Sequence, residues 1–210
     1  MEVICYELEV VYLEHAIIQI KNNPIYSILD IETTGGKYNE EGITEIAIYK
    51  FDGHEVVDQF ITLVNPERDI QPFVVNLTGI NSKMLRSAPK FYEIAKRIVE
   101  ITQDTILVAH NAKFDYRILR TEFRRLGFDF SKETLCTVEL SKDLIPQEDS
   151  YSLGKLTRSL GIPVSDRHRA AGDAQSTVKL FKMLLAKDLN KNIIKESIRL
   201  EPKYQMDPKL

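Results

Sequence analysis

Cysteine is nearly absent from this sequence, whose 210 residues contain only Cys5 and Cys136. Two cysteines this far apart argue against a disulfide framework and against a cysteine-rich zinc site. The first residues include Glu2, Glu7 and Glu9, where a secretory signal would carry Lys or Arg. We therefore expect a soluble protein of a reducing, cytoplasmic compartment.

Long apolar runs are also missing, because none reaches the ~20 residues that cross a bilayer. We accordingly expect no association with a membrane. An excess of positive charge is missing as well, since 28 Lys and Arg face 31 Asp and Glu and give a formal charge of −3. This balance excludes a protein that holds nucleic acid mainly through surplus cations, but it leaves open nucleic acid held through metal ions on carboxylates.

Enough apolar sequence is present for one folded domain with short extensions, because 43% of the residues are hydrophobic and 28% are charged. Residues 1–23 form an N-terminal extension in which apolar residues recur every seven positions, which indicates a helix. The domain itself is expected over residues 24–187. Residues 188–210 are expected to begin as a helix and to end as a polar tail.

Within the domain, the pattern predicts a strand over residues 25–32 that is apolar on both faces and therefore central in a sheet. Strands over 43–51 and 56–64 are joined through Asp52-Gly53, a hairpin signal. A short buried strand is expected over 105–109, and residues 134–140 fit either a strand or a helix. Helices are expected over 72–77, 91–101, 112–126, 153–160 and 170–185. The order predicts an α/β fold with a mixed sheet and helices on it.

Two carboxylates, Asp30 and Glu32, flank Ile31 near the end of the central strand. Side chains at i and i+2 share a face of a strand, about 6.6–6.8 Å apart, which lets both engage one metal centre. The alternative is a strand that simply emerges into solvent. Because ligands of open α/β sheets bind at the carboxyl ends of strands, this position is a candidate site.

A third acid, Asp115, lies in the helix expected over 112–126, which Asn111 is positioned to cap with its side chain. On a helical wheel Asp115 falls beside Ile118 and Leu119, on the inward stripe. A buried acid needs a cationic partner. An edge position that reaches water is the alternative.

His168 and Asp173 are five residues apart, so they cannot share one face of a helix. They converge if His168 lies on the loop before the helix and Asp173 lies in its first turn. Taken singly, Asp173 is equally well explained as an acid that stabilises the helix dipole. His168, between Arg167 and Arg169, is more simply read alone as a solvated loop residue.

Taken together, three segments resemble the motifs of the four-acidic-residue 3′→5′ exonucleases in their histidine-containing branch (DEDDh, DnaQ-like), a family that includes the epsilon proofreading subunit of bacterial DNA polymerase III. They are Asp-Ile-Glu-Thr-Thr-Gly at 30–35, His-Asn-Ala-Lys-Phe-Asp at 110–115 and His-Arg-Ala-Ala-Gly-Asp at 168–173. Leu-Thr-Gly-Ile at 77–80 and Tyr-Ser-Leu at 151–153 match weaker features of the family. The resemblance covers about residues 24–187.

The resemblance implies a ribonuclease H-like fold, with three antiparallel strands followed by parallel strands, flanked by α-helices. It implies that Asp30, Glu32, Asp115 and Asp173 hold two Mg²⁺ or Mn²⁺ ions and that His168 is the general base. Elementary electrostatics agrees, since two carboxylates 4 Å apart repel by about 4 kcal/mol at an effective dielectric constant of 20, and hard cations relieve this. More weakly, the resemblance assigns substrate contacts to five residues: Thr33, Thr34, Thr78, His110 and Asn111.

The expected reaction is metal-dependent release of nucleoside 5′-monophosphates from single-stranded 3′ ends, with DNA favoured, as in replication proofreading or repair. One alternative is an RNA-trimming enzyme that resembles ribonuclease T or oligoribonuclease. Another is a non-catalytic module that docks on a polymerase, although a scaffold needs none of the five catalytic residues. The expected partners are a single-stranded 3′ end and, more weakly, the polymerase III alpha subunit or a sliding clamp, for which residues 205–210 offer a faint peptide match.

Overall fold

The computed structural model describes residues 24–200. The helix expected over residues 1–23 and the end of the polar tail, residues 201–210, lie outside the described residues.

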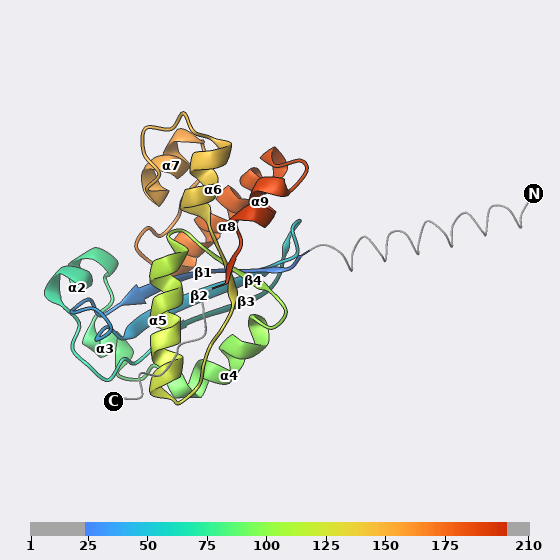
Figure 1. The fold of residues 1–210 in the computed structure, drawn as a ribbon. Coiled ribbons are helices and arrows are strands. Elements are labelled where there is room, and N and C mark those ends of the chain that lie inside the picture. The colour runs from blue at the N-terminus through green and yellow to red at the C-terminus, as the bar shows by residue number, and fades with distance from the viewer. Residues whose placement is uncertain (1–23, 201–210) are drawn as a thin grey trace, which may run out of the picture.

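A single mixed sheet of six strands organises the described part of the chain (Figure 1). The strands are β1 (Tyr26–Thr33), β2 (Ile43–Phe51), β3 (Val56–Leu63), β4 (Ile106–Ala109), β5 (Glu133–Cys136) and β6 (Arg199–Leu200). Their order across the sheet is β3-β2-β1-β4-β5-β6. The first three strands pair antiparallel, β4 and β5 continue parallel to β1, and β6 pairs antiparallel with β5. The predicted mixed α/β sheet with a central first strand is confirmed.

The turn between β2 and β3 is the predicted hairpin. The side chain of Asp52 accepts hydrogen bonds from the backbone N–H groups of His54 and Glu55, both at 2.8 Å. Gly53 adopts φ 97°, a left-handed conformation that favours glycine. The hairpin places β2 beside β1 in the register that the site below depends on.

Helices cover both faces of the sheet. They are α2 (Pro72–Thr78), α3 (Ser82–Leu85), α4 (Phe91–Ile101), α5 (Ala112–Arg125), α6 (Thr137–Leu144), α7 (Leu153–Ser159), α8 (Ala170–Lys187) and α9 (Asn192–Ser197). Figure 1 shows α6, α7, α8 and α9 gathered above the sheet and α4 below it. Burial divides accordingly, because Tyr26 and Ile28 pack with α8 on one face while Leu29 and Ile31 pack with α4 and α5 on the other.

The sequence pattern did not define four short elements, which are β5, α6, α3 and β6. Residues 134–140 contain both of the structures that the pattern allowed, since β5 ends at Cys136 and α6 begins at Thr137. Helix α3 and the two-residue strand β6 are too short to show a periodicity. Beyond residue 187, Ile194 is buried in the core around α8, and β6 joins the sheet.

Among the helices of residues 24–200, none combines the length and apolar character needed to cross a bilayer.

Candidate active site

Strand β1 extends beyond its pairing with β4, so that its carboxyl end is open on the β4 side. Only Tyr26, Ser27 and Ile28 pair with β4, whereas β1 continues to Thr33. Asp30 and Glu32 lie on this extension and alternate with the buried Ile31, so both face the same side of the sheet. Both side chains are only partly buried, which leaves them accessible from solvent.

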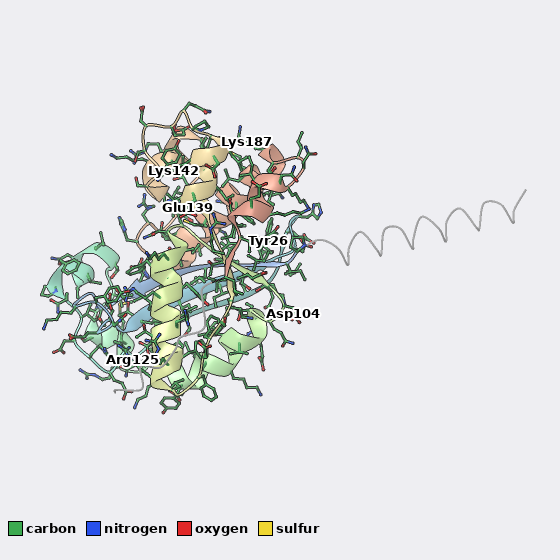
Figure 2. All side chains as sticks on the ribbon, in the orientation of Figure 1. Tyr26, Asp104, Arg125, Glu139, Lys142 and Lys187 are labelled. Carbon is green, nitrogen blue, oxygen red and sulfur yellow. The ribbon has the colours of Figure 1, made fainter. Side chains whose placement is uncertain are left out.

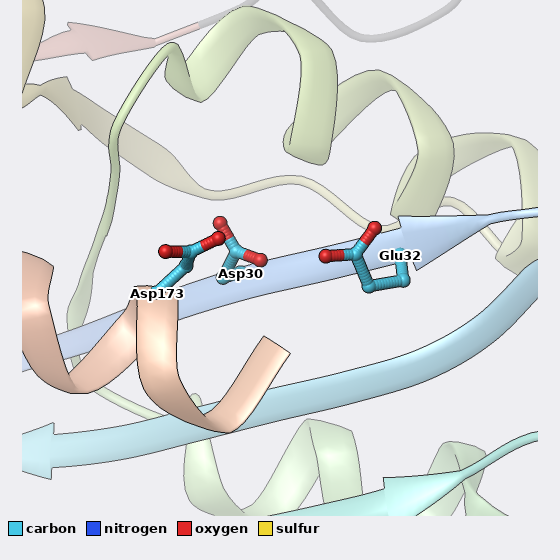
Figure 3. Close-up of side chains that lie close together, drawn as sticks. All are labelled: Asp30, Glu32 and Asp173. Atoms are coloured by element: carbon cyan, nitrogen blue, oxygen red, sulfur yellow. The ribbon is translucent and has the colours of Figure 1, made fainter. Parts of the chain in front are cut away.

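A third carboxylate reaches the same place from α8. Asp173 lies in the first turn of this helix and is 7% exposed. One carboxylate oxygen each from Asp30, Glu32 and Asp173 lies within 4.8 Å of the other two, an arrangement that can hold a metal ion (Figure 3). The structure therefore brings together two strand residues and one helix residue about 140 positions apart in the sequence.

Asp115 approaches from the opposite face and is not part of this group of three described residues. It lies in the first turn of α5, is 4% exposed, and its Oδ1 accepts a hydrogen bond of 3.1 Å from the backbone N–H of Ile31. That N–H belongs to the part of β1 that has no strand on the β4 side. Asp115 thus lies on the inward side of its helix, as the periodicity predicts, and is fixed to the strand that carries Asp30 and Glu32.

His168 lies on the loop before α8, with a left-handed backbone at φ 61°. Its backbone N–H donates to Asp173 Oδ2 at 3.0 Å, while Asp173 Oδ1 lies 3.1 Å from Arg167 Nε. His168 therefore lies on the loop before the helix and Asp173 in its first turn, which is the condition that the sequence spacing set for the two residues to meet. A left-handed non-glycine residue is uncommon and occurs often at functional sites.

Gly172 allows this loop to lie directly on α8. A Cβ atom at position 172 would stand 2.2 Å from the carbonyl oxygen of Ser165 and 2.4 Å from that of Asp166. Any larger residue must push the loop away from the helix. Because His168 follows this contact by only two residues, the absence of a side chain at Gly172 helps to set where His168 lies.

Glu45 on β2 is a site residue that the sequence analysis missed. It is 3% exposed and stands opposite Glu32 in the β1–β2 register. Its carboxylate accepts hydrogen bonds from Arg169 Nε at 3.0 Å, Arg169 Nη2 at 2.6 Å and the backbone N–H of Ala170 at 2.8 Å. Glu45 therefore ties the start of α8 to the sheet beside the carboxylates. The signal was a lone acid inside the otherwise apolar and neutral run at 43–49.

Burial and the neighbouring negative charges raise the pKa values of Asp30, Glu32 and Asp115. Burial raises the pKa of Glu32 to about 7, and the negative charges of Asp173 and Glu45 act in the same direction. Burial, followed by the charge of Asp115, holds the pKa of Asp30 well above its usual range. Burial raises the pKa of Asp115 to about 8, although the hydrogen bond from Ile31 opposes the shift. Asp30, Glu32 and Asp115 therefore ionise less readily here than they would in water.

The ring of His110 is held by the protein on both sides. Nδ1 lies 2.9 Å from Thr137 Oγ1, and Nε2 lies 2.8 Å from the carbonyl oxygen of Tyr151, which accepts its proton. Burial lowers the pKa of His110, which favours the neutral ring. His110 thus links the start of α5 to α6 and to the segment before α7.

Asn111 occupies the N-cap position of α5, but the predicted side-chain cap is wrong. Its backbone is left-handed at φ 80°, and its side chain makes no cap hydrogen bond. N-cap residues usually have extended backbones, which aim the side chain at the first free N–H groups of the helix. The left-handed turn directs the Asn111 side chain elsewhere.

The three threonines expected at the substrate use their hydroxyl groups within the protein. Thr78 Oγ1 donates to the Val74 carbonyl at 2.9 Å, and Thr34 Oγ1 accepts from Gly42 N at 3.1 Å. Thr33 Oγ1 accepts from Gly35 N at 3.3 Å. The Thr34 N–H donates to the Gly42 carbonyl. The substrate contacts assigned to Thr33, Thr34, Thr78, His110 and Asn111 stay predictions.

The donor set suits a divalent cation. Three carboxylates offer hard oxygen ligands at mutual distances within 4.8 Å, and such ligands suit Mg²⁺ or Mn²⁺ rather than a metal that prefers thiolate. A bound cation would also favour the ionised forms of Asp30, Glu32 and Asp115, whose pKa values are raised.

The comparison with known proteins decides the family. Residues 27–181 match the RNase_T family model, which is described as Exonuclease. The chain belongs to this DnaQ-like (DEDDh) exonuclease family. Residues 27–181 therefore form an exonuclease domain, which is a hydrolytic nuclease domain. The match covers all three motifs and ends within α8.

Two curated relatives carry a similar segment in much longer chains. The chain is 35% identical over 162 residues to DNA polymerase III PolC-type of Caldanaerobacter subterraneus, covering 77% of this chain and 12% of that protein. It is also 35% identical over 157 residues to 3′-5′ exonuclease DinG of Staphylococcus haemolyticus, covering 74% of this chain and 17% of that protein. The chain thus spans less than a fifth of either relative.

Solved structures share the fold. Exonuclease X in complex with 5′ overhanging duplex DNA is 28% identical, with a TM-score of 0.65 over 78% of this chain and 92% of that chain. E. coli Exonuclease I in complex with a dT13 oligonucleotide is 21% identical, with a TM-score of 0.72 over 80% of this chain and 42% of that chain. The expected ribonuclease H-like fold is confirmed.

Proposed function

We propose that this chain is a metal-dependent 3′→5′ exonuclease that releases nucleoside 5′-monophosphates from single-stranded 3′ ends, with DNA as the preferred substrate. The observation that carries the proposal is the meeting of Asp30, Glu32 and Asp173 at the carboxyl end of β1. A carboxylate cluster in which the pKa values of Asp30 and Glu32 are raised, in a domain of an exonuclease family, is the arrangement expected of a cation-dependent phosphodiester hydrolase.

Asp30, Glu32 and Asp173 would hold one divalent cation, and Asp115 would join them in holding a second. Bound there, Mg²⁺ or Mn²⁺ would supply Lewis-acid polarisation of the phosphate, activation of water and stabilisation of the departing 3′-oxygen. The chain contributes the geometry, since Asp115 is hydrogen-bonded to β1 and Asp173 to the backbone of the loop at His168.

His168 is the proposed general base. An imidazole nitrogen of His168 would take the proton from the attacking water, the role that histidine most often has in general base catalysis. Support comes from its position on the loop that Gly172 admits against α8, with its backbone bound to Asp173. Asp173 would thus serve both the cation and the placement of the base.

DNA is favoured over RNA because the relatives at 35% identity are named as a DNA polymerase and as a 3′-5′ exonuclease, and because Exonuclease X was solved on DNA. The test is parallel digestion of DNA and RNA strands of equal sequence, each labelled at its 5′ end, with Mn²⁺. We expect the DNA to shorten one nucleotide at a time and the RNA to shorten more slowly. Faster digestion of RNA would transfer the assignment to an RNA-trimming enzyme.

Proofreading is the narrowest part of the proposal, and the PolC-type relative supports it. Primer–template duplexes with a matched or a mismatched 3′ terminus test it directly. An enzyme that needs an unpaired end should remove the mismatched nucleotide several times faster, because a mismatched base costs less to unpair. Equal rates on both duplexes would contradict a proofreading role and would leave the exonuclease assignment intact.

A further inference from the structure

A groove of about 420 Å³ runs along the outward side of α5, beyond the carboxylate site. Five cationic side chains contribute to its lining, against the single carboxylate of Glu139: Lys113, Arg117, Arg120, Arg124 and Arg199. The whole chain carries a formal charge of −3. Positive charge is therefore concentrated at this groove in an otherwise acidic protein.

The cations of α5 form one stripe. Lys113, Arg117, Arg120 and Arg124 follow one another at intervals of four, three and four residues, which places them on one side of a helix. From Lys113 to Arg124 this stripe spans about 16 Å along α5. Figure 2 shows the side chains of α5 between the labels of Glu139 and Arg125.

The members of the stripe differ in how far they are exposed. Arg117 pairs with the buried Glu41, with Nη2 2.8 Å from Oε1, and its side chain is 17% exposed. Lys113 and Arg124 are exposed, as is Arg199, which lines the groove from β6. The exposed members can therefore meet an anion from solvent, while Arg117 has a fixed place beneath them.

The groove and the carboxylate site share the first turn of α5. Asn111, Ala112 and Lys113 line the groove, while Asp115 in the same turn faces inward to β1. A strand whose 3′ end lies among the carboxylates would reach the groove by passing over the start of α5.

An aromatic ring stands at the groove beside the cations. Tyr38 lines the groove and is 72% exposed. The guanidinium of Arg117 lies 4.3 Å from the centroid of the Tyr38 ring and 5.4 Å from that of Phe114, the residue next to Asp115. Because Glu41 holds Arg117, the guanidinium supports the Tyr38 ring from one side and leaves most of it open for stacking. Aromatic rings beside a cationic groove are the features by which single strands are bound without sequence preference.

We propose that this groove binds the phosphate backbone of the single strand 5′ to its reacting end, with one base stacked on Tyr38. The inference rests on the proposed function and extends it from the terminal nucleotide to the strand behind it. An acidic protein would also suit the cations, but the exposed Tyr38 ring and the first turn of α5 that the groove shares with the carboxylate site favour a nucleic acid strand.

The first test compares two double variants that remove equal charge. Lys113→Gln/Arg124→Gln changes the groove, whereas Lys96→Gln/Lys187→Gln changes exposed residues on α4 and α8 outside it. Affinity for a labelled 12-nucleotide DNA strand is measured in chelator, so that no cleavage occurs. The groove variant should bind about tenfold more weakly at physiological salt, and its log–log salt slope should fall by about 1.4, since each lost phosphate contact removes about 0.7 from the slope. The control should match the wild type in both.

A small substrate separates this inference from the proposed function. Hydrolysis of the p-nitrophenyl ester of thymidine 5′-monophosphate with Mn²⁺ needs the carboxylate site and no strand behind it. The groove variant should retain this activity while losing strand affinity. No hydrolysis by the wild type would overturn the proposed function itself. Retained hydrolysis with unchanged strand affinity in the groove variant would overturn the groove as a nucleic acid site and leave it to an acidic protein.

Tyr38→Ala provides an independent test, with Tyr92→Ala on α4 as its matched exposed control. A lost base stack should weaken strand binding about fivefold or more without altering the salt slope, because stacking involves no counterion release. Equal affinity of the two variants would contradict the stacking role of Tyr38.

Discussion

His168 is the residue whose proposed role differs most from its simplest interpretation as a solvated loop histidine. Replacing it with Ala should lower kcat by about 10²–10⁴, the usual contribution of a positioned general base. We expect bound Mn²⁺ to raise the melting temperature of the wild type, because a ligand that binds only the folded state stabilises it. The same rise should remain in His168→Ala, because His168 is proposed as a base and not as a ligand. Steady-state kinetics and thermal unfolding of the same sample measure both.

His54 is the matched control, since it lies exposed in the β2–β3 turn. His54→Ala should retain wild-type turnover. If His168→Ala also retained it, with an unchanged pH profile, His168 would return to the role of a solvated loop residue.

The carboxylate cluster should make stability depend on pH in an unusual direction. Glu32 has an ordinary pKa of 4.5 when unfolded and about 7 when folded. Between these values the folded state holds the proton that the unfolded state has lost, so the free energy of unfolding falls as the pH rises. In chelator, we therefore expect the melting temperature to decrease from about pH 5 to about pH 7.

Saturating Mn²⁺ should remove this decrease, because the cation favours the ionised carboxylates. Glu32→Gln should reduce the decrease in chelator, whereas Glu55→Gln in the exposed turn should not. The raised pKa of Glu32 would be contradicted if the melting temperature in chelator decreased equally in the wild type and in Glu32→Gln, or if it rose over this pH range in the wild type.

For single residues, the sequence predicted the carboxylates of the site better than it predicted Glu45, which holds the start of α8 beside them. The spacing of Asp30 and Glu32 and the helical position of Asp115 follow from local periodicity alone. Glu45 could not be found in that way, because its role depends on the β1–β2 register and on Arg169, 124 residues further along the chain.

Among the elements, α8 is held to the sheet beside the site by the ion pair between Glu45 and Arg169, in addition to its apolar packing. Glu45→Gln should destabilise the protein by about 1–3 kcal/mol, less than for a fully buried pair because the Arg169 side chain is 35% exposed. It should also lower kcat, since the first turn of α8 carries Asp173 and follows His168. Chemical unfolding and steady-state kinetics measure the two effects.

Asp58→Asn supplies the control, because Asp58 on β3 pairs with Arg97 on α4, away from the site, and both side chains are more than a third exposed. Its loss should change stability by less than about 1 kcal/mol and leave kcat unchanged. Equal loss of kcat in the two variants would show that the effect of Glu45 is general destabilisation.

The sequence predicted long helices with a clear apolar periodicity, but it did not define short elements or elements that follow one another without a loop. Helices α4, α5 and α8 follow the apolar periodicity, and Gly127 closes the helix signal of α5 at φ 82°. The junction at Cys136 and Thr137 has neither Gly nor Pro between a four-residue strand and an eight-residue helix, so the pattern allowed both. Strand β6 exists only through its pairing with β5, which no local pattern encodes.

In the whole molecule, the position of the site follows from the sheet, because the central strand β1 continues beyond the end of its pairing with β4. Asp115 enters from the α5 face and Asp173 from the α8 face, and both meet β1 where the strand to its side has ended. The proposed exonuclease function also predicts how substrates are chosen, since an exonuclease needs a free strand end. A closed single-stranded DNA circle should therefore resist digestion by an amount of enzyme that consumes the linear form. Internal cuts in the circle would contradict exonuclease action.

The central claim is that Asp30, Glu32 and Asp173 form a divalent-cation site, and calorimetric titration of the full chain with Mn²⁺ tests it most directly. The wild type should bind Mn²⁺ with measurable heat, and Asp173→Asn should lose most of that binding while remaining folded. Glu55→Gln should bind as the wild type does. Equal Mn²⁺ binding by wild type and Asp173→Asn, or no binding by either, would contradict the account.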